Sequence, residues 1–166
     1  MKFLVYGGVV LLIIPFQVVV VHRFAIEGIV PDAVLVTVCL VGLWRGEFEA
    51  VVLGLVLGFL QDLLSGATVY LNLMTKPLIG LAIGIVGRTP LSLIRWMIPI
   101  LITGISFVSG LIILFLLQAS SSEMDVVQAL LSIVLPQALY DGVLGAIVLL
   151  ATFRLFPTLH RRVWNP

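Results

Sequence analysis

The sequence predicts an all-α integral membrane protein, folded as one bundle of about six transmembrane helices. Hydrophobic residues make up 61% of the 166 residues and charged residues only 10%, with a mean hydropathy of +1.28. A soluble domain carries about a quarter charged residues, and a chain of this length has too little interior to hide so much apolar surface. The bilayer must therefore take up the excess, and the length allows a single domain.

Six apolar runs are the expected spans. We place them near residues 3–21, 32–44, 50–64, 73–86, 96–117 and 126–153. A span needs about 20 residues, so the second, third and fourth runs are short, and two of them could instead form a re-entrant pair. The first run is interpreted as a retained helix, because it is long for a signal peptide and has no A-x-A-like cleavage site.

Local chemistry marks several helix ends. Pro31 and Asp32 open the second run, where proline suits the first turn and a carboxylate complements the helix dipole. Gly46 and Gly66 follow apolar runs, as helix-terminating glycines do.

The distribution of basic residues predicts the orientation. With six spans, one side holds seven basic residues and the other side holds two, Arg23 and Lys76. The seven are Lys2, Arg45, Arg88, Arg95, Arg154, Arg161 and Arg162. Because basic residues concentrate on the cytoplasmic side, we expect both termini there; a five-span topology would weaken the asymmetry.

Charged side chains at membrane depth are candidates for a functional site. Asp62 lies about one turn before the end of the third run, and Lys76 lies about one turn into the fourth. Because a short loop joins these antiparallel runs, the two side chains could form an ion pair, and with Asn72 they could line a polar pocket near the outer leaflet. The alternative is that both are interfacial groups that reach water.

Asp141 is the deepest carboxylate, near the middle of the last run and one turn after Gln137. Insertion of a charge at that depth costs about 2.5–3.5 kcal/mol. Pro136 removes a backbone hydrogen bond and predicts a kink one turn earlier, near Ser132. Asp141 either joins two helices as a neutral acid, or belongs to a binding pocket or a partner contact.

Small residues recur every four positions in three of the runs. Such spacing lets helix backbones approach closely. We favour packing within the bundle over an interface with a partner. The positions are Gly54 and Gly58 in the third run, Gly80 and Gly84 in the fourth, and Ala138, Gly142 and Ala146 in the sixth.

Catalytic residues, a metal site and a cofactor site are not expected. His22 and His160 lie near opposite ends of the bilayer, and no zinc-protease, hydrolase or phosphate-loop motif occurs. The single cysteine, Cys39, lies in an apolar run and is interpreted as an inert buried thiol. Sparse basic residues give no footprint for nucleic acid.

Several motifs follow one another along the chain, namely Pro31-Asp32-Ala33-Val34-Leu35, Arg45-Gly46, residues 54–66, Leu71-Asn72, Lys76, Gly80 and Gly84. Their order resembles the MreD family of bacterial rod shape-determining membrane proteins. The match in motifs covers about the middle third of the chain, and the match in length and span number covers nearly all of it. The most specific piece is the Asp-Leu-Leu-Ser-Gly segment after a glycine-spaced helix.

The resemblance implies a non-enzymatic scaffold in the cell-elongation complex for peptidoglycan synthesis, in the bacterial inner membrane. MreD-like proteins act with MreC, a single-pass membrane protein, beside RodA, its transpeptidase partner and MreB. We expect lateral packing against the MreC-like helix, with membrane lipids as the other neighbours. The family is also similar in fold to the substrate-binding subunits of energy-coupling-factor vitamin transporters.

Two alternatives follow from the same residues. A vitamin-binding subunit would dock to its coupling subunit through a first helix with alanines every four positions. Residues 7–15 of the first run contain no such alanine ladder. An intramembrane lipid-modifying enzyme could use Asp62 or Asp141, but neither has a second catalytic group at matching depth.

Overall fold

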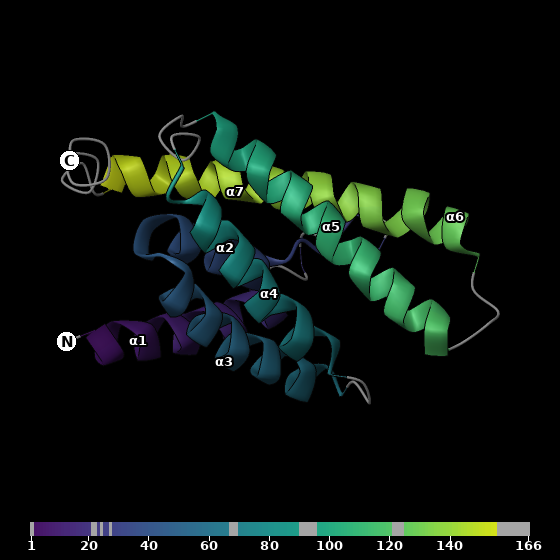
Figure 1. The fold of residues 1–166 in the computed structure, drawn as a ribbon, viewed down its shortest axis with the longest axis horizontal. Coiled ribbons are helices and arrows are strands. Elements are labelled where there is room, and N and C mark those ends of the chain that lie inside the picture. Colours follow the sequence, from purple (N-terminus) through teal and green to yellow (C-terminus); the bar gives the residue numbers. More distant parts are fainter. Residues whose placement is uncertain are drawn as a thin grey trace.

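The computed structural model describes residues 2–20, 23, 25–26, 28–66, 70–89, 96–120 and 125–155. Within these ranges the regular structure is helical, which confirms the predicted all-α class, and six rods follow the chain (Figure 1). The rods are α1 (Lys2–Pro15) with a π-helical segment (Phe16–Val20), α2 (Ala33–Arg45), α3 (Glu47–Ser65), α4 (Leu71–Val86), α5 (Met97–Ser120), and a last rod of α6 (Val126–Ala129), a second π-helical segment (Leu130–Val134) and α7 (Leu135–Leu155).

The helices differ in length, and this difference shapes the interior. Three stretches within the described residues are long and apolar enough to cross a membrane, namely Glu47–Ser65, Met97–Ala119 and Val126–Thr152. At a rise of 1.5 Å per residue, the 13 residues of α2 extend only about 20 Å, against a hydrocarbon core of about 30 Å. One end of α2 must therefore lie within the bundle.

Two glycines end helices as the sequence predicts. Gly66 closes α3 in the left-handed region, with φ 65°, and its N–H donates to the Asp62 carbonyl. Gly46, with φ 93°, lies between α2 and α3 and donates to the Gly42 carbonyl. Because residues other than glycine rarely adopt such φ values, both positions favour glycine.

Helices α3 and α4 pack closely because their glycines face each other's backbone. A Cβ added at Gly58 would lie 2.5 Å from the Asn72 carbonyl oxygen, and one added at Gly80 would lie 2.6 Å from that of Ala50. Gly54 likewise faces the backbone of residues 76–77 and Gly84 that of residue 47, while Gly142 of α7 faces Thr103 of α5. These glycines are contact points inside the bundle.

Pro136 is accommodated by a change of helix type. The π-helical segment Leu130–Val134 ends two residues before Pro136, and α7 continues beyond it. The predicted disturbance is thus present one turn earlier, as a π-helical turn.

The bundle hides a compact core and turns large apolar residues outward. The largest core cluster joins α2, α4, α5 and α7 around Cys39, Ile83 and Ile102, all 0% exposed. Leu12, Phe48 and Phe115 are 74–78% exposed, which suits a lipid-facing surface. The start of α1 and the end of α7 lie at the same end of the molecule (Figure 1), as an even number of spans requires.

Candidate functional site

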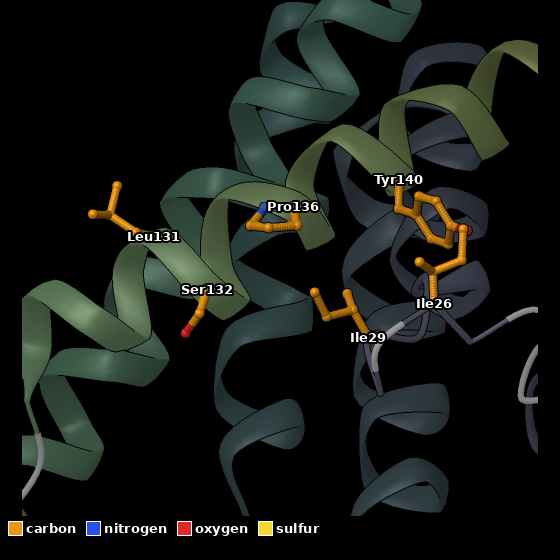
Figure 2. A pocket seen from close by; sticks show the side chains of 6 residues that line it. All are labelled: Ile26, Ile29, Leu131, Ser132, Pro136 and Tyr140. Carbon is orange, nitrogen blue, oxygen red and sulfur yellow. The ribbon is translucent and has the colours of Figure 1, made fainter.

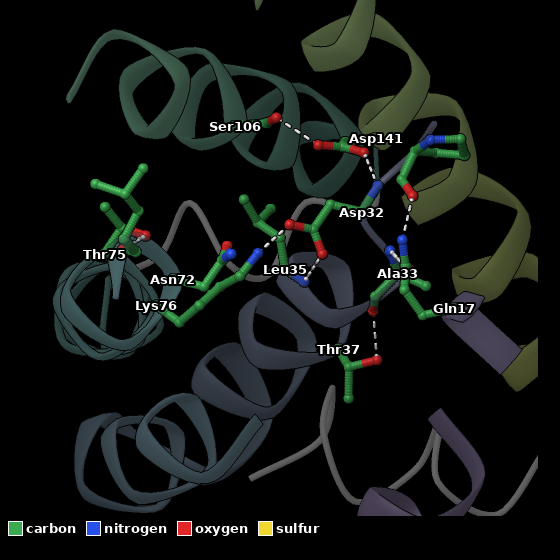
Figure 3. Close-up of polar contacts among 12 residues, drawn as sticks. Gln17, Asp32, Ala33, Leu35, Thr37, Asn72, Thr75, Lys76, Ser106 and Asp141 are labelled. Atoms are coloured by element: carbon green, nitrogen blue, oxygen red, sulfur yellow. Dashed lines mark hydrogen bonds and ion pairs between the residues drawn. The ribbon is translucent and has the colours of Figure 1, made fainter. Parts of the chain in front are cut away.

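The start of α2 lies inside the bundle, where its first backbone N–H groups donate to the side chain that directly precedes the helix and to side chains of the first and last rods. The Asp32 carboxylate accepts the Leu35 N–H at 2.8 Å, and the Gln17 amide oxygen accepts the Ala33 N–H at 2.8 Å. Asp141 of α7 accepts the N–H of Asp32 at 2.6 Å (Figure 3). The first N–H groups of a helix have no partner within it, so these three bonds allow α2 to begin away from water.

Asp32 and Lys76 form an ion pair at this point. The Lys76 ammonium donates to Asp32 Oδ2, and the Lys76 side chain is only 1% exposed. Figure 3 shows the lysine extending from α4 toward the start of α2. A lysine this deep requires a compensating charge, and the carboxylate at the start of α2 supplies it.

Asp141 connects three helices. One carboxylate oxygen accepts the Asp32 N–H and the other accepts the hydroxyl of Ser106 on α5 (Figure 3). The residue is 0% exposed. Its position fits the expected acid that joins helices, and it fixes α2 and α5 to the middle of the last rod.

The expected ion pair between Asp62 and Lys76 is wrong. Asp62 instead accepts the Asn72 N–H at 3.2 Å, the Asn72 side-chain amide at 2.8 Å and the Leu73 N–H at 2.8 Å. The carboxylate of α3 thus caps the start of α4, where a negative charge also complements the helix dipole. Lys76 lies one turn further along α4, within reach of the buried start of α2.

A polar cavity of about 240 Å³ adjoins this network. The described residues that line it are Asp32, Leu35, Gln61, Asn72, Ser106, Ser109, Gly110, Ile113, Val134 and Gln137. Of the three residues expected to form a pocket, Asn72 lines this cavity, whereas Asp62 is engaged with the start of α4 and Lys76 with Asp32. Gln137, expected as an intramembrane polar residue, also lines it.

A second hollow, of about 260 Å³, lies between the segment before α2 and the last rod (Figure 2). Ile26 and Ile29 pair through their backbones around Gly28, and their side chains face Pro136 and Tyr140. The lining is mostly apolar, so this hollow offers little chemistry.

The chemistry available to the described residues is limited. No group of three or more His, Cys, Asp or Glu among them is placed to hold a metal ion. Cys39 is a free, fully buried thiol. Arg95, Arg161, Arg162, His22 and His160 lie outside the described residues.

Sequence reasoning missed part of the network. It identified Asp32 as a helix start without a partner, and it passed over Gln17, Ser106 and Ser109. A glutamine near the end of the first apolar run and two serines one turn apart in the fifth are polar residues at membrane depth, and such residues are candidates for functional or structural contacts. Gln17 and Ser106 pair with residues outside their own helices, so their pairing could not be predicted without the fold.

Together, the helical rods, the outward apolar residues and the helix starts satisfied by buried side chains define an integral membrane protein of the helical bundle class. The family model for rod shape-determining protein MreD matches residues 1–159. The chain therefore belongs to the MreD family of rod shape-determining membrane proteins. No curated protein and no solved structure matches it.

Proposed function

We propose that this chain is a non-enzymatic scaffold of the cell-elongation complex in the bacterial inner membrane, with both termini in the cytoplasm. Its direct partner would be an MreC-like single-pass protein that packs against it laterally. RodA, its transpeptidase partner and MreB would be further members of the same assembly. The family match and the basic residues expected on one side support this proposal.

The main observation in support of the scaffold role is that the buried carboxylates hold helices together. Asp32, Asp62 and Asp141 each accept backbone N–H groups at helix starts, and Asp32 also pairs with Lys76. A general acid or base has to face its substrate, whereas these groups are occupied in holding helices together. This arrangement favours a structural role.

Open glycines on the outer surface suggest where a partner helix would pack. Gly104 of α5 and Gly7 of α1 have no other atom within 4 Å of an added Cβ, whereas the glycines of α3 and α4 are used internally. Gly104 is flanked on its face by Ile100 and Val108, which are 67% and 54% exposed. A glycine between large apolar side chains leaves a notch in the helix surface, and this notch lets a second helix approach closely.

Bulky substitutions at these glycines test the proposal. If the MreC-like partner packs on α5, Gly104→Leu should reduce its co-purification at least severalfold, and if the partner packs on α1, Gly7→Leu should do so. In either case the leucine side chain keeps the two helix backbones apart. Ile100→Leu is the matched control, since it changes shape on the same face without filling a notch. Unchanged co-purification with both glycine variants would refute packing at these notches, and no recovery of the partner with the unmodified chain would refute the scaffold.

One observation favours a second candidate, a substrate-binding subunit of an energy-coupling-factor transporter. The polar cavity lies inside a six-rod bundle, as a solute site would. This candidate predicts that the chain supports uptake only with an ATP-hydrolysing module. Normal solute uptake in cells that have lost the chain, together with altered cell shape, would exclude it.

A further inference from the structure

The polar cavity holds more hydrogen-bonding capacity than the protein uses. Gln61 Oε1 is buried and has no hydrogen-bond partner among the described residues. Ser109, 4% exposed, and Gln137 line the same cavity from α5 and α7. Buried polar groups are nearly always paired, so these groups call for an occupant that both donates and accepts hydrogen bonds.

The described wall of the cavity offers a ligand no charge that lacks a partner. Among its described lining residues, Asp32 is the only ionisable one, and its carboxylate is engaged by Lys76 and by the Leu35 N–H. The remaining polar groups are the amides of residues 61, 72 and 137 and the hydroxyls of residues 106 and 109. Asp62 and Asp141 do not line the cavity, and they already accept hydrogen bonds from residues that do. Burying a further charge in the cavity would be unfavourable, because no unengaged charge lines it. The occupant is therefore expected to be neutral.

The size and the lining of the cavity restrict the chemical class of the occupant further. A volume of about 240 Å³ equals on the order of eight water molecules at ~30 Å³ each. Leu35, Ile113 and Val134 add an apolar wall to the amides and hydroxyls. A sugar ring combines these properties, because hydroxyls project from its edge while its faces carry C–H groups.

We propose that the polar cavity binds a neutral, hydroxyl-bearing group of the size of one sugar residue. Primary amides suit such a ligand, since each carries a donor and an acceptor that can meet neighbouring hydroxyls. The same chemistry is available from a free sugar and from the glycosyl headgroup of a lipid. The inference does not depend on packing against a single-pass partner.

The binding test uses the full chain in phosphatidylcholine nanodiscs, prepared without glycoside detergents. Glucose is the neutral probe, with glucosamine and glucose 6-phosphate as charged probes, and binding is followed by saturation-transfer NMR. We expect saturable binding of glucose and at least tenfold weaker binding of both charged sugars. Dodecyl glucoside added to the nanodiscs tests the lipid-borne source: tighter binding than glucose would assign a glycolipid, and equal or weaker binding a free sugar.

Matched variants localise the binding. Gln61→Leu or Gln137→Leu should weaken glucose binding about tenfold, since each leaves a ligand hydroxyl unpaired, and Ser109→Ala should weaken it about threefold. Gln118→Leu is the control, because Gln118 also has an unpaired buried oxygen but does not line the cavity. Ser109→Ala removes a single oxygen, so it remains informative if a leucine variant fails to fold.

Three results would overturn the proposal. The first is that neither glucose nor dodecyl glucoside shows saturable binding, in which case the cavity holds water alone. The second is that a charged sugar binds as tightly as glucose. The third is that Gln118→Leu weakens binding as much as the cavity variants do.

Discussion

The buried ion pair between Asp32 and Lys76 gives the sharpest test of how this bundle is held together. Lys76→Met removes the charge and keeps a side chain of similar length. The Asp32 carboxylate then retains the Leu35 N–H, at 2.8 Å, as its described partner, and it lies beside Asp141, which accepts the Asp32 N–H. Removing one member of a buried pair costs about 3–5 kcal/mol, because the other charge is left uncompensated.

The double variant makes the prediction quantitative. Asp32→Asn should cost about 3–5 kcal/mol as well, because Lys76 is left unpaired, although asparagine preserves the helix cap. Combining Asp32→Asn with Lys76→Met removes both charges and should cost only about 0.5–1.5 kcal/mol, the net value of a hydrogen bond. The two single costs are therefore far from additive, with a coupling energy of at least about 4.5 kcal/mol.

Equilibrium unfolding in mixed micelles measures these costs. The mole fraction of dodecyl sulfate is raised against dodecyl maltoside, and helix content is followed by circular dichroism. Arg88→Met is the control, since the Arg88 side chain is 71% exposed in its pair with Glu47, and an exposed pair contributes at most about 1 kcal/mol. Single costs for Asp32→Asn and Lys76→Met that add up within about 0.5 kcal/mol in the double variant would refute the pairing.

Three further predictions use the same purified protein. Asp62→Ala should destabilise the fold by about 1–2 kcal/mol, because the start of α4 loses its cap; a stability equal to that of the unmodified chain would contradict the capping role. Gly80→Ala should cost about 1–3 kcal/mol, since the new methyl meets the α3 backbone, while Gly7→Ala should stay within about 0.5 kcal/mol; equal costs would argue against the α3–α4 contact. Cys39, being fully buried, should react with a maleimide only after unfolding in dodecyl sulfate, and rapid labelling of the folded protein would show that the core around it is open.

The helices were largely predictable because their signals are local. Hydropathy marks each run, and Gly46 and Gly66 end helices through their own backbone freedom. The Pro136 disturbance is equally local, although the sequence does not distinguish a kink from a π-helical turn.

The polar network was less predictable, because the pairing of its residues depends on how deep each one lies in the bundle. Asp32 follows a loop in the sequence, which suggests a position at the membrane surface. In the fold, the segment before α2 enters the bundle, and the Asp32 N–H donates to Asp141 in the middle of the last rod. Lys76 therefore finds its partner at residue 32 instead of residue 62, a difference that only the relative placement of short and long helices determines.

Side-specific labelling tests the central claim of a chain that spans the membrane with both ends in the cytoplasm. In a Cys39→Ala background, single cysteines are added at either terminus or introduced as Gln128→Cys, at an exposed residue of α6. An impermeant maleimide applied to intact spheroplasts should label the Gln128→Cys protein and should reach neither terminus until the membrane is opened. Labelling of one terminus from outside, with the other protected, would contradict the account.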